Sequence, residues 1–359
     1  MKKILALTLA MLLVFALVAC ADAPGPAPVA PSPTPAPGET TDPADDTQPP
    51  LTPLEGPANV AVIIKATTSD FWQFVLIGAN NYAVENPDRV SITTHGPPNE
   101  ADIDQQVSIL EDVIAMNPDA IVIASTSSDA TVPALERAVE AGIVVITIDN
   151  RVHTDVVHSF LATDNRSGGA MAAEYMHGLL VDAHGDDLSG MTIGVISAMA
   201  GVQVLIDRDE GFINRMRELA PGLVILDTRY TDNDMANTMT AVEDIITANP
   251  DIIGIFADNN TTGSGTSRVI TERNLHDDVV VVAFDSDPEQ VAGLESGAIN
   301  ALVLQDPFGM GYRGVGYALQ MLAGQSIPRE VDTGATLVTS ANMHDPEIVG
   351  LLDPTTLRR

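Results

Sequence analysis

The stretch AMNPDAI at residues 115–121 returns as TANPDII at residues 247–253, so one motif occurs twice at an offset of 132 residues. The apolar run that ends at Asp149 returns as the run that ends at Asp285, at an offset of 136 residues. The first expected strands of the two halves begin 133 residues apart. Three landmarks with nearly the same offset indicate an internal duplication, so we expect two similar lobes.

The segments between these landmarks predict strands that alternate with helices. Residues 100–116 place Ile103, Val107 and Leu110 on one helical stripe. Short β-branched runs are typical of parallel strands that are buried on both faces. Such runs occupy residues 59–65, 120–124, 143–148, 192–197, 223–226, 252–256 and 279–284. The expected fold class is therefore α/β, with two doubly wound parallel-sheet lobes.

The first twenty residues have the pattern of an export signal. Two lysines precede an apolar run at residues 4–19, which is shorter than the roughly 20 residues that span a bilayer. LVAC at residues 17–20 is similar to the bacterial lipobox, so Cys20, the only cysteine, is expected to carry a lipid. Residues 21–57 are rich in proline, alanine, threonine and acidic residues and predict a disordered tether.

The composition excludes several classes of function. The formal net charge is −32, with only 17 Lys plus Arg, and this charge opposes binding to nucleic acid. The roughly 300 residues after the tether exceed what one core usually serves, so two domains are expected. Histidine and acidic residues show no metal-ligand spacing, so we expect neither a metal nor a cofactor.

Polar side chains at the carboxyl ends of the expected strands are the first candidate ligand contacts. In open parallel sheets, ligands bind where these ends meet loops and helix N-termini. This rule selects Lys65, Ser125, Asp149, Ser197, Asn259 and Asp285.

The residues near these positions suit a sugar. Hydroxyl groups donate and accept hydrogen bonds, and the C–H faces of a sugar pack on aromatic rings. Phe71 and Trp72 begin the helix after the first strand, and because adjacent helical residues point about 100° apart, we expect at least one ring at the cleft. The planar polar candidates are Asp149, Asn150, Arg151, Asn259, Asp285 and Gln305.

Seven short motifs carry a family resemblance. They are Ser69-Asp70-Phe71-Trp72, Ile146-Thr147-Ile148-Asp149, Thr163-Asp164-Asn165, Arg208-Asp209-Glu210-Gly211-Phe212, Phe256-Ala257-Asp258-Asn259, Ala283-Phe284-Asp285 and Leu304-Gln305-Asp306-Pro307. On these motifs, residues 59–338 resemble the type 1 periplasmic binding proteins. The resemblance is greatest to the ribose-binding subgroup with its galactose, xylose and autoinducer relatives.

The resemblance implies two lobes that close on one ligand about three hinge segments, near residues 163–164, 305–306 and 333–338. The N-terminal lobe would comprise residues 58–163 and 306–334, and the C-terminal lobe residues 164–305 and 335–359. The implied sugar contacts are Asp149, Asn259, Asp285 and Gln305 as hydrogen-bonding groups, Phe71 or Trp72 as a stacking ring, and Ser69 from the first motif.

Two departures from the ribose-type pattern affect the expected pocket. The subgroup has an arginine directly after the first aspartate, whereas here Asn150 intervenes and Arg151 follows. Where the subgroup has a second pocket arginine, just before the Arg-x-x-Gly-Phe segment, our alignment places Ile206. The loss of a planar fork of donors changes which hydroxyls are recognised, so the ligand is expected to differ from ribose.

The sequence therefore predicts a solute-binding lipoprotein outside the cytoplasm, and not an enzyme. It would act as a monomer, capture a small polar ligand such as a monosaccharide, and deliver it to the permease subunits of an ABC transporter, with the membrane reached through the lipid anchor. One alternative is a sensor that presents a sugar or autoinducer-like ligand to a membrane receptor. Another is a tethered glycoside hydrolase that uses Asp149 and Asp285. GMGYRG at residues 309–314 matches a dinucleotide fingerprint but lacks the preceding strand context, so we expect these glycines to serve helix packing.

Overall fold

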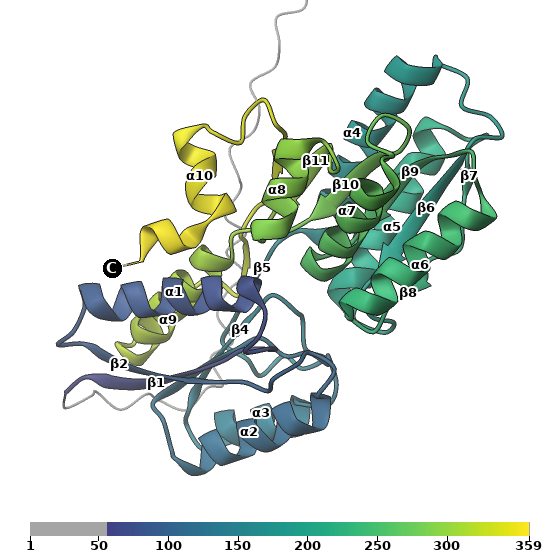
Figure 1. The fold of residues 1–359 in the computed structure, drawn as a ribbon. Helices are drawn as coiled ribbons and strands as arrows, with labels where there is room; N and C mark the ends of the chain where they lie inside the picture. Colours follow the sequence, from purple (N-terminus) through teal and green to yellow (C-terminus); the bar gives the residue numbers. More distant parts are fainter. Residues whose placement is uncertain (1–55, 359) are drawn as a thin grey trace, which may run out of the picture. The chain divides into compact units, whose positions relative to one another are not determined.

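The computed structural model describes residues 56–358. The expected signal peptide, with Cys20, and nearly all of the expected tether lie outside the described residues. The described residues form two sheets of mostly parallel strands, each with helices on both faces (Figure 1). This arrangement confirms the expected α/β fold of two doubly wound lobes. Within residues 56–358, no helix combines the length and the apolar character needed to cross a bilayer.

The first sheet is entirely parallel, and a pair of helices covers each of its faces. Its strands, in spatial order, are β12 (Glu330–Asp332), β5 (Ser159–Ala162), β4 (Val144–Ile148), β3 (Ala120–Ile123), β1 (Ala58–Ile63) and β2 (Val90–His95). One face is covered by α1 (Asp70–Glu85) and α9 (Pro307–Leu322), and the other by α2 (Ile103–Ala115) and α3 (Val132–Glu140) (Figure 1).

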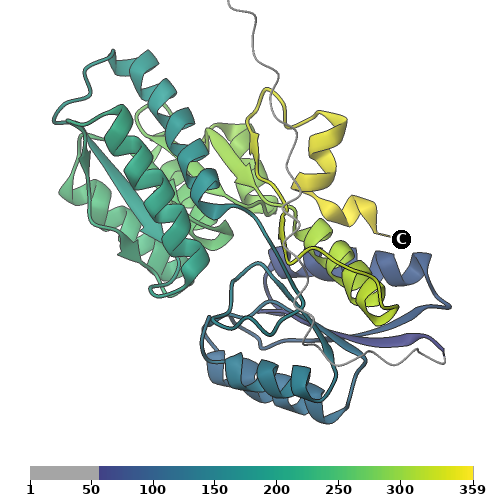
Figure 2. The same cartoon turned by 180° about the vertical axis from the view of Figure 1, so that it is seen from behind.

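The second sheet repeats this plan and adds one antiparallel edge strand. Its strands, in spatial order, are β13 (Thr336–Val338), β11 (Ala301–Leu304), β10 (Val280–Phe284), β9 (Ile252–Ala257), β6 (Thr192–Ser197) and β7 (Val224–Ile225), and β8 (Arg229–Tyr230) also pairs with β6. One face is covered by α4 (Asn165–His184) and α5 (Gln203–Leu219), which Figure 2 shows from behind. The other is covered by α6 (Met235–Ala248), α7 (Asn260–Arg273) and α8 (Pro288–Ser296).

The strands are apolar on both faces because both faces are covered. In β1, Val60 and Val62 belong to the core beneath α1 and α9, whereas Ala61 and Ile63 belong to the core beneath α2 and α3. Side chains alternate between the faces of a strand, so a strand buried on both sides needs an unbroken apolar run. This explains why these strands could be recognised in the sequence.

Glycines let α1 and α9 approach closely. A Cβ atom on Gly311 would lie 2.0 Å from the carbonyl oxygen of Val75, and one on Gly78 would lie 2.0 Å from that of Phe308. No side chain fits at such distances, so both positions require glycine. The prediction that the glycines of residues 309–314 serve helix packing is therefore confirmed for Gly311, whereas a Cβ atom on Gly309 would meet the Asp306 side chain and one on Gly314 the Val122 side chain of β3.

The chain passes between the two sheets three times, after β5, after β11 and after β12. These passages lie near the three expected hinge segments, while the residue limits of the two lobes stay a prediction. The C-terminal elements α10 (Pro346–Leu352) and η1 (Pro354–Leu357) follow β13. Leu352 joins the core of the second sheet, whereas η1 contacts α1, where Asn81 Nδ2 donates to the Leu357 carbonyl at 2.5 Å.

Candidate ligand-binding site

Two aspartates occupy equivalent positions in the two sheets. Asp149 directly follows β4 and Asp285 directly follows β10, and both adopt left-handed backbone angles, with φ of 66° and 69°. The Asp149 N–H donates to the Leu161 carbonyl at 2.8 Å, and the Asp285 N–H donates to the Val303 carbonyl at 2.9 Å. Aspartate tolerates this conformation better than most residues. The internal duplication therefore extends to the backbone geometry of the two strand ends.

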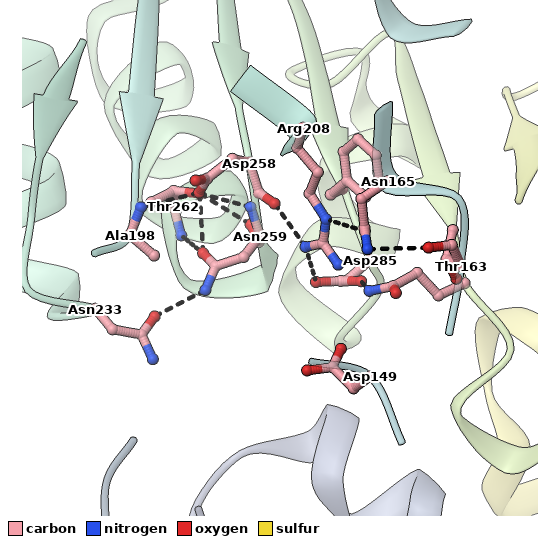
Figure 3. Close-up of polar contacts among 12 residues, drawn as sticks. Asp149, Thr163, Asn165, Ala198, Arg208, Asn233, Asp258, Asn259, Thr262 and Asp285 are labelled. Carbon is pink, nitrogen blue, oxygen red and sulfur yellow. Dashed lines mark hydrogen bonds and ion pairs between the residues drawn. The ribbon is translucent and has the colours of Figure 1, made fainter. Parts of the chain in front are cut away.

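Side chains from both sheets line one small pocket, which we call the inner pocket. Its volume is about 30 Å³, room for one or two water molecules as the side chains stand. It is lined by Lys65, Phe71, Trp72, Glu100, Asp149, Val202, Val204, Leu205, Arg208, Asn259, Asn260, Asp285 and Gln305. Figure 3 shows Asp149 near Asp285, which lies beside Arg208. Six of the nine predicted contact residues are thus brought together.

Both aromatic rings of the first turn of α1 line the inner pocket. Phe71 and Trp72 are buried, and their rings meet edge to face with centroids 4.8 Å apart. We expected at least one ring at the cleft, and the structure has both there because the N-terminal end of α1 borders the pocket. Ser69 is the N-cap residue of α1 and makes no side-chain capping bond. It lines neither the inner pocket nor the larger cavity beside it.

A buried ion pair lies beside these rings. Lys65 Nζ is 2.5 Å from Asp149 Oδ2, and the ammonium lies 5.3 Å from the centroid of the Trp72 ring. Trp72 Nε1 donates to Glu100 Oε1 at 2.5 Å. Burial raises the pKa of Glu100, and the nearby Lys65 opposes that shift. The N-terminal half therefore presents an ammonium and two carboxylates around one ring.

Arg208, the arginine of the Arg-x-x-Gly-Phe segment, supplies the cation of the other half, whereas Ile206 does not line the inner pocket. Arg208 Nε donates to Asn165 Oδ1 at 2.8 Å, and Nη1 donates to the Asp258 carbonyl at 2.9 Å (Figure 3). Nη1 also lies 3.7 Å from Asp285 Oδ2. Val204 and Arg208 lie one helical turn apart in α5 and share a face, so helical spacing was the signal that could have found Arg208.

The remaining polar groups are held in fixed orientations. Gln305 Nε2 donates to Asp285 Oδ1 at 2.6 Å. Asn259 is the N-cap of α7, because its Oδ1 accepts from the Thr262 N–H at 2.9 Å. Burial raises the pKa of Asp285, while the guanidinium of Arg208 opposes the shift. Preorganised groups of this kind reduce the ordering cost of binding a ligand.

Asn150 and Arg151 lie beside the inner pocket, on a larger cavity of about 510 Å³. Arg151 is half exposed, its Nη1 pairs with Glu330 Oε1 at 2.8 Å, and its guanidinium lies 4.5 Å from the Phe160 ring centroid. Asn150 is buried and its Nδ2 donates to the Thr126 carbonyl at 3.4 Å. Although this cavity is larger, we assign the site to the inner pocket, where two aromatic rings of α1 lie beside buried charged groups from both sheets.

Two further buried carboxylates lie behind Arg208. Asp209 and Asp258 are buried, and Ser197 Oγ donates to Asp258 Oδ2 at 2.5 Å. Burial raises the pKa of Asp209 to about 8, with the nearby Asp258 carboxylate adding to the shift, and burial raises the pKa of Asp258 to about 7. Two like charges in one buried site disfavour the simultaneous ionisation of both carboxyl groups.

This pair predicts a pH dependence of stability. In the unfolded chain both groups ionise near pH 4, so between about pH 4 and pH 8 the folded state binds more protons and loses stability as the pH rises. The effect is at most about 1.4 kcal/mol per pH unit for each proton. In Asp209→Asn the amide replaces the protonated carboxyl, so we expect its urea midpoint to rise relative to wild type from pH 5 to pH 8. Exposed Asp278→Asn should follow wild type, and parallel profiles for Asp209→Asn would refute the interpretation.

The geometry favours binding over hydrolysis. Asp149 is paired with Lys65, and Asp285 accepts from Gln305 and lies beside Arg208. Both carboxylates are therefore engaged as acceptors in fixed positions. A retaining or inverting glycosidase needs one carboxyl group that delivers a proton and a second that acts as nucleophile or base.

Comparisons with known proteins agree with this geometry. A model of the periplasmic binding protein domain matches residues 60–326. The D-ribose/D-allose-binding protein of Pseudomonas aeruginosa is 28% identical over 291 residues, which cover 78% of this chain and 88% of that protein. A carbohydrate transporter solute-binding protein from Agrobacterium radiobacter, solved with D-arabinose, is 36% identical with a TM-score of 0.79, covering 83% of this chain and 99% of the other.

A second solved structure gives the same result. An ABC transporter solute-binding protein from Agrobacterium vitis, solved with D-fucose, is 33% identical with a TM-score of 0.76, covering 82% of this chain and 99% of the other. These relatives are sugar-binding transport proteins, which supports the expectation that the chain is not an enzyme. The chain belongs to the sugar-binding family of type 1 periplasmic binding proteins.

Proposed function

We propose that this protein captures a neutral monosaccharide among the groups that line the inner pocket, which must move apart to admit it because the pocket measures only about 30 Å³ as they stand, and delivers it to the permease subunits of an ABC transporter. The observation that supports this is the composition of the pocket, in which two aromatic rings lie beside carboxylate, amide and cationic groups from both sheets. Rings can pack on the C–H faces of a sugar, while the polar groups can donate to and accept from its hydroxyls.

The charge balance of the pocket opposes an anionic ligand. The cationic groups Lys65 and Arg208 lie beside Asp149 and Asp285, and Glu100 adds a third carboxyl group. An anionic ligand would therefore bring an unmatched buried charge, which is costly. The relatives solved with D-arabinose and D-fucose, and the one named for D-ribose and D-allose, support a pentose or hexose as the ligand class.

The proposed location follows from the sequence. The lipobox-like residues 17–20 support lipid attachment at Cys20, and the proline-rich segment supports a tether that holds the sugar-binding region off the membrane. One chain contributes both halves of the pocket, which supports function as a monomer. Mass spectrometry of the mature N-terminus tests the lipid, because Cys20→Ser should remove the added acyl mass.

A thermal-shift screen tests the ligand class. The panel consists of D-arabinose, D-fucose, D-tagatose, D-ribose and D-allose, and it includes a polyol and a nucleoside as ligands of other classes. A sugar at 100 times its Kd stabilises the folded state by about 2.7 kcal/mol and should raise Tm by several degrees. At least one neutral sugar should do so and be recovered unchanged. A panel without any shift, or turnover of the sugar, would contradict the proposal.

A further inference from the structure

The contacts of Arg208 lead from the inner pocket to two of the passages between the sheets. Arg208 Nε donates to Asn165 Oδ1 at 2.8 Å, and Asn165 Nδ2 donates to the Thr163 carbonyl at 3.0 Å (Figure 3). Thr163 lies in the passage after β5. Its Oγ1 is 3.2 Å from Thr333 Oγ1, which belongs to the passage after β12. A continuous line of hydrogen bonds therefore connects the cation of the pocket to both passages.

The members of this line from Arg208 to Thr163 are buried, whereas Thr333 is partly buried. Arg208 is 2% exposed, Thr163 4% and Asn165 7%. A buried guanidinium keeps its orientation only where acceptors meet its N–H groups, and a lost acceptor leaves a buried donor unsatisfied. The hydrogen bonds of Arg208 within residues 56–358 use Nε and Nη1, and Nη2 takes part in none of them. The Asn165 amide thus helps to fix where Nη2 points.

We infer that Asn165 is a positioning residue for ligand binding. Its carbonyl oxygen holds the Arg208 guanidinium toward the inner pocket, and its amide nitrogen ties that guanidinium to the passage at Thr163. Asn165 lines the larger cavity but not the inner pocket, so its effect on a ligand in the inner pocket would pass through Arg208. The inference rests on the proposed function in one respect, namely that Arg208 contacts the sugar.

The experiment compares three variants of the full chain. Asn165→Leu removes both bonds of the amide, whereas Asn165→Asp keeps an acceptor for Arg208 Nε and loses only the donor to Thr163. Asn300→Leu is the matched control, because the Asn300 Oδ1 accepts from the Val281 N–H at 2.7 Å in the second sheet and lies outside the inner pocket. The readouts are the solvent exchange of the Arg208 Nε–H resonance by NMR without sugar, the Kd for D-arabinose and the Tm.

We expect Asn165→Leu to accelerate Arg208 Nε–H exchange and to weaken D-arabinose binding, each at least tenfold. Asn165→Asp should restore both to within about threefold of wild type, a rescue that a merely structural role would not produce. Asn300→Leu should lower Tm and change neither readout. The inference is overturned if Asn165→Leu leaves Nε–H exchange at the wild-type rate, or if Asn165→Asp fails to restore it. If wild type does not bind D-arabinose, that sugar is not the ligand, and the exchange rates decide the role of Asn165 alone.

Discussion

Asp285→Asn is expected to raise the Kd for the captured sugar by at least about 100-fold. A hydrogen bond to a charged acceptor contributes about 1.5–3 kcal/mol, and a carboxylate can accept from two hydroxyls, so replacing it with an amide removes most of that contribution. Asparagine is preferable to alanine here because Asp285 has a φ of 69°, a conformation that asparagine also adopts. Isothermal titration with the sugar that gives the largest thermal shift measures the change.

A second left-handed aspartate provides the control for this prediction. Asp232 has a φ of 54°, is exposed, and lines neither the inner pocket nor the larger cavity. Asp232→Asn therefore makes the same chemical change in the same backbone conformation away from the site, and it should bind like wild type. If Asp285→Asn bound the sugar within threefold of wild type, Asp285 would not be a ligand contact.

Lys65→Met is expected to cause the largest loss of stability, about 3–5 kcal/mol. The side chains of Lys65 and Asp149 are 2% and 4% exposed, so the substitution leaves a buried carboxylate without its counter-charge. Urea unfolding without sugar measures the loss. The double variant Lys65→Met/Asp149→Asn removes both charges and should recover much of it, because an apolar and a neutral side chain need no ion pair.

The outcome that would contradict this prediction is an unchanged urea midpoint in Lys65→Met. In that case Asp149 would be stabilised by other groups. A double variant with a lower free energy of unfolding than Lys65→Met would also contradict the prediction, because removing the unpaired Asp149 charge would then not have stabilised the protein.

Seven of the thirteen strands in residues 56–358 could be predicted because a buried parallel strand forms an apolar run in the local sequence, although the buried β11 (Ala301–Leu304) was not among them. All seven predicted runs are strands in the structure with limits that differ by at most two residues, as for residues 59–65 against β1 at Ala58–Ile63. The edge strand β2 was missed because most side chains of Val90–His95 are at least partly exposed and form no apolar run. The three-residue β12 was missed because only its pairing with β5, far away in the chain, makes it a strand.

The candidate site residues that lie at the ends of strands could be predicted from the topology of the sheets. Those that lie on helices or loops were harder to predict. The strand-end rule located Asp149 and Asp285, because parallel strands deliver their carboxyl ends to one edge. Glu100 and Arg208 were missed because their positions depend on where a helix begins and how it rotates. Arg151 was expected at the ligand, but it pairs with Glu330 outside the inner pocket, and its role in binding stays a prediction.

The end of the chain adds a connection that sequence-based lobe limits do not describe. Leu352 is part of the second-sheet core, while Asn81 on α1 holds the carbonyl of Leu357 five residues later. Pro354, between them, is buried. A motion that drew α1 away from the second sheet would have to break these contacts of the tail, so the tail would raise the free energy that such a motion needs. Tags or truncations at this end are therefore expected to alter the apparent sugar affinity, measured as the Kd by isothermal titration.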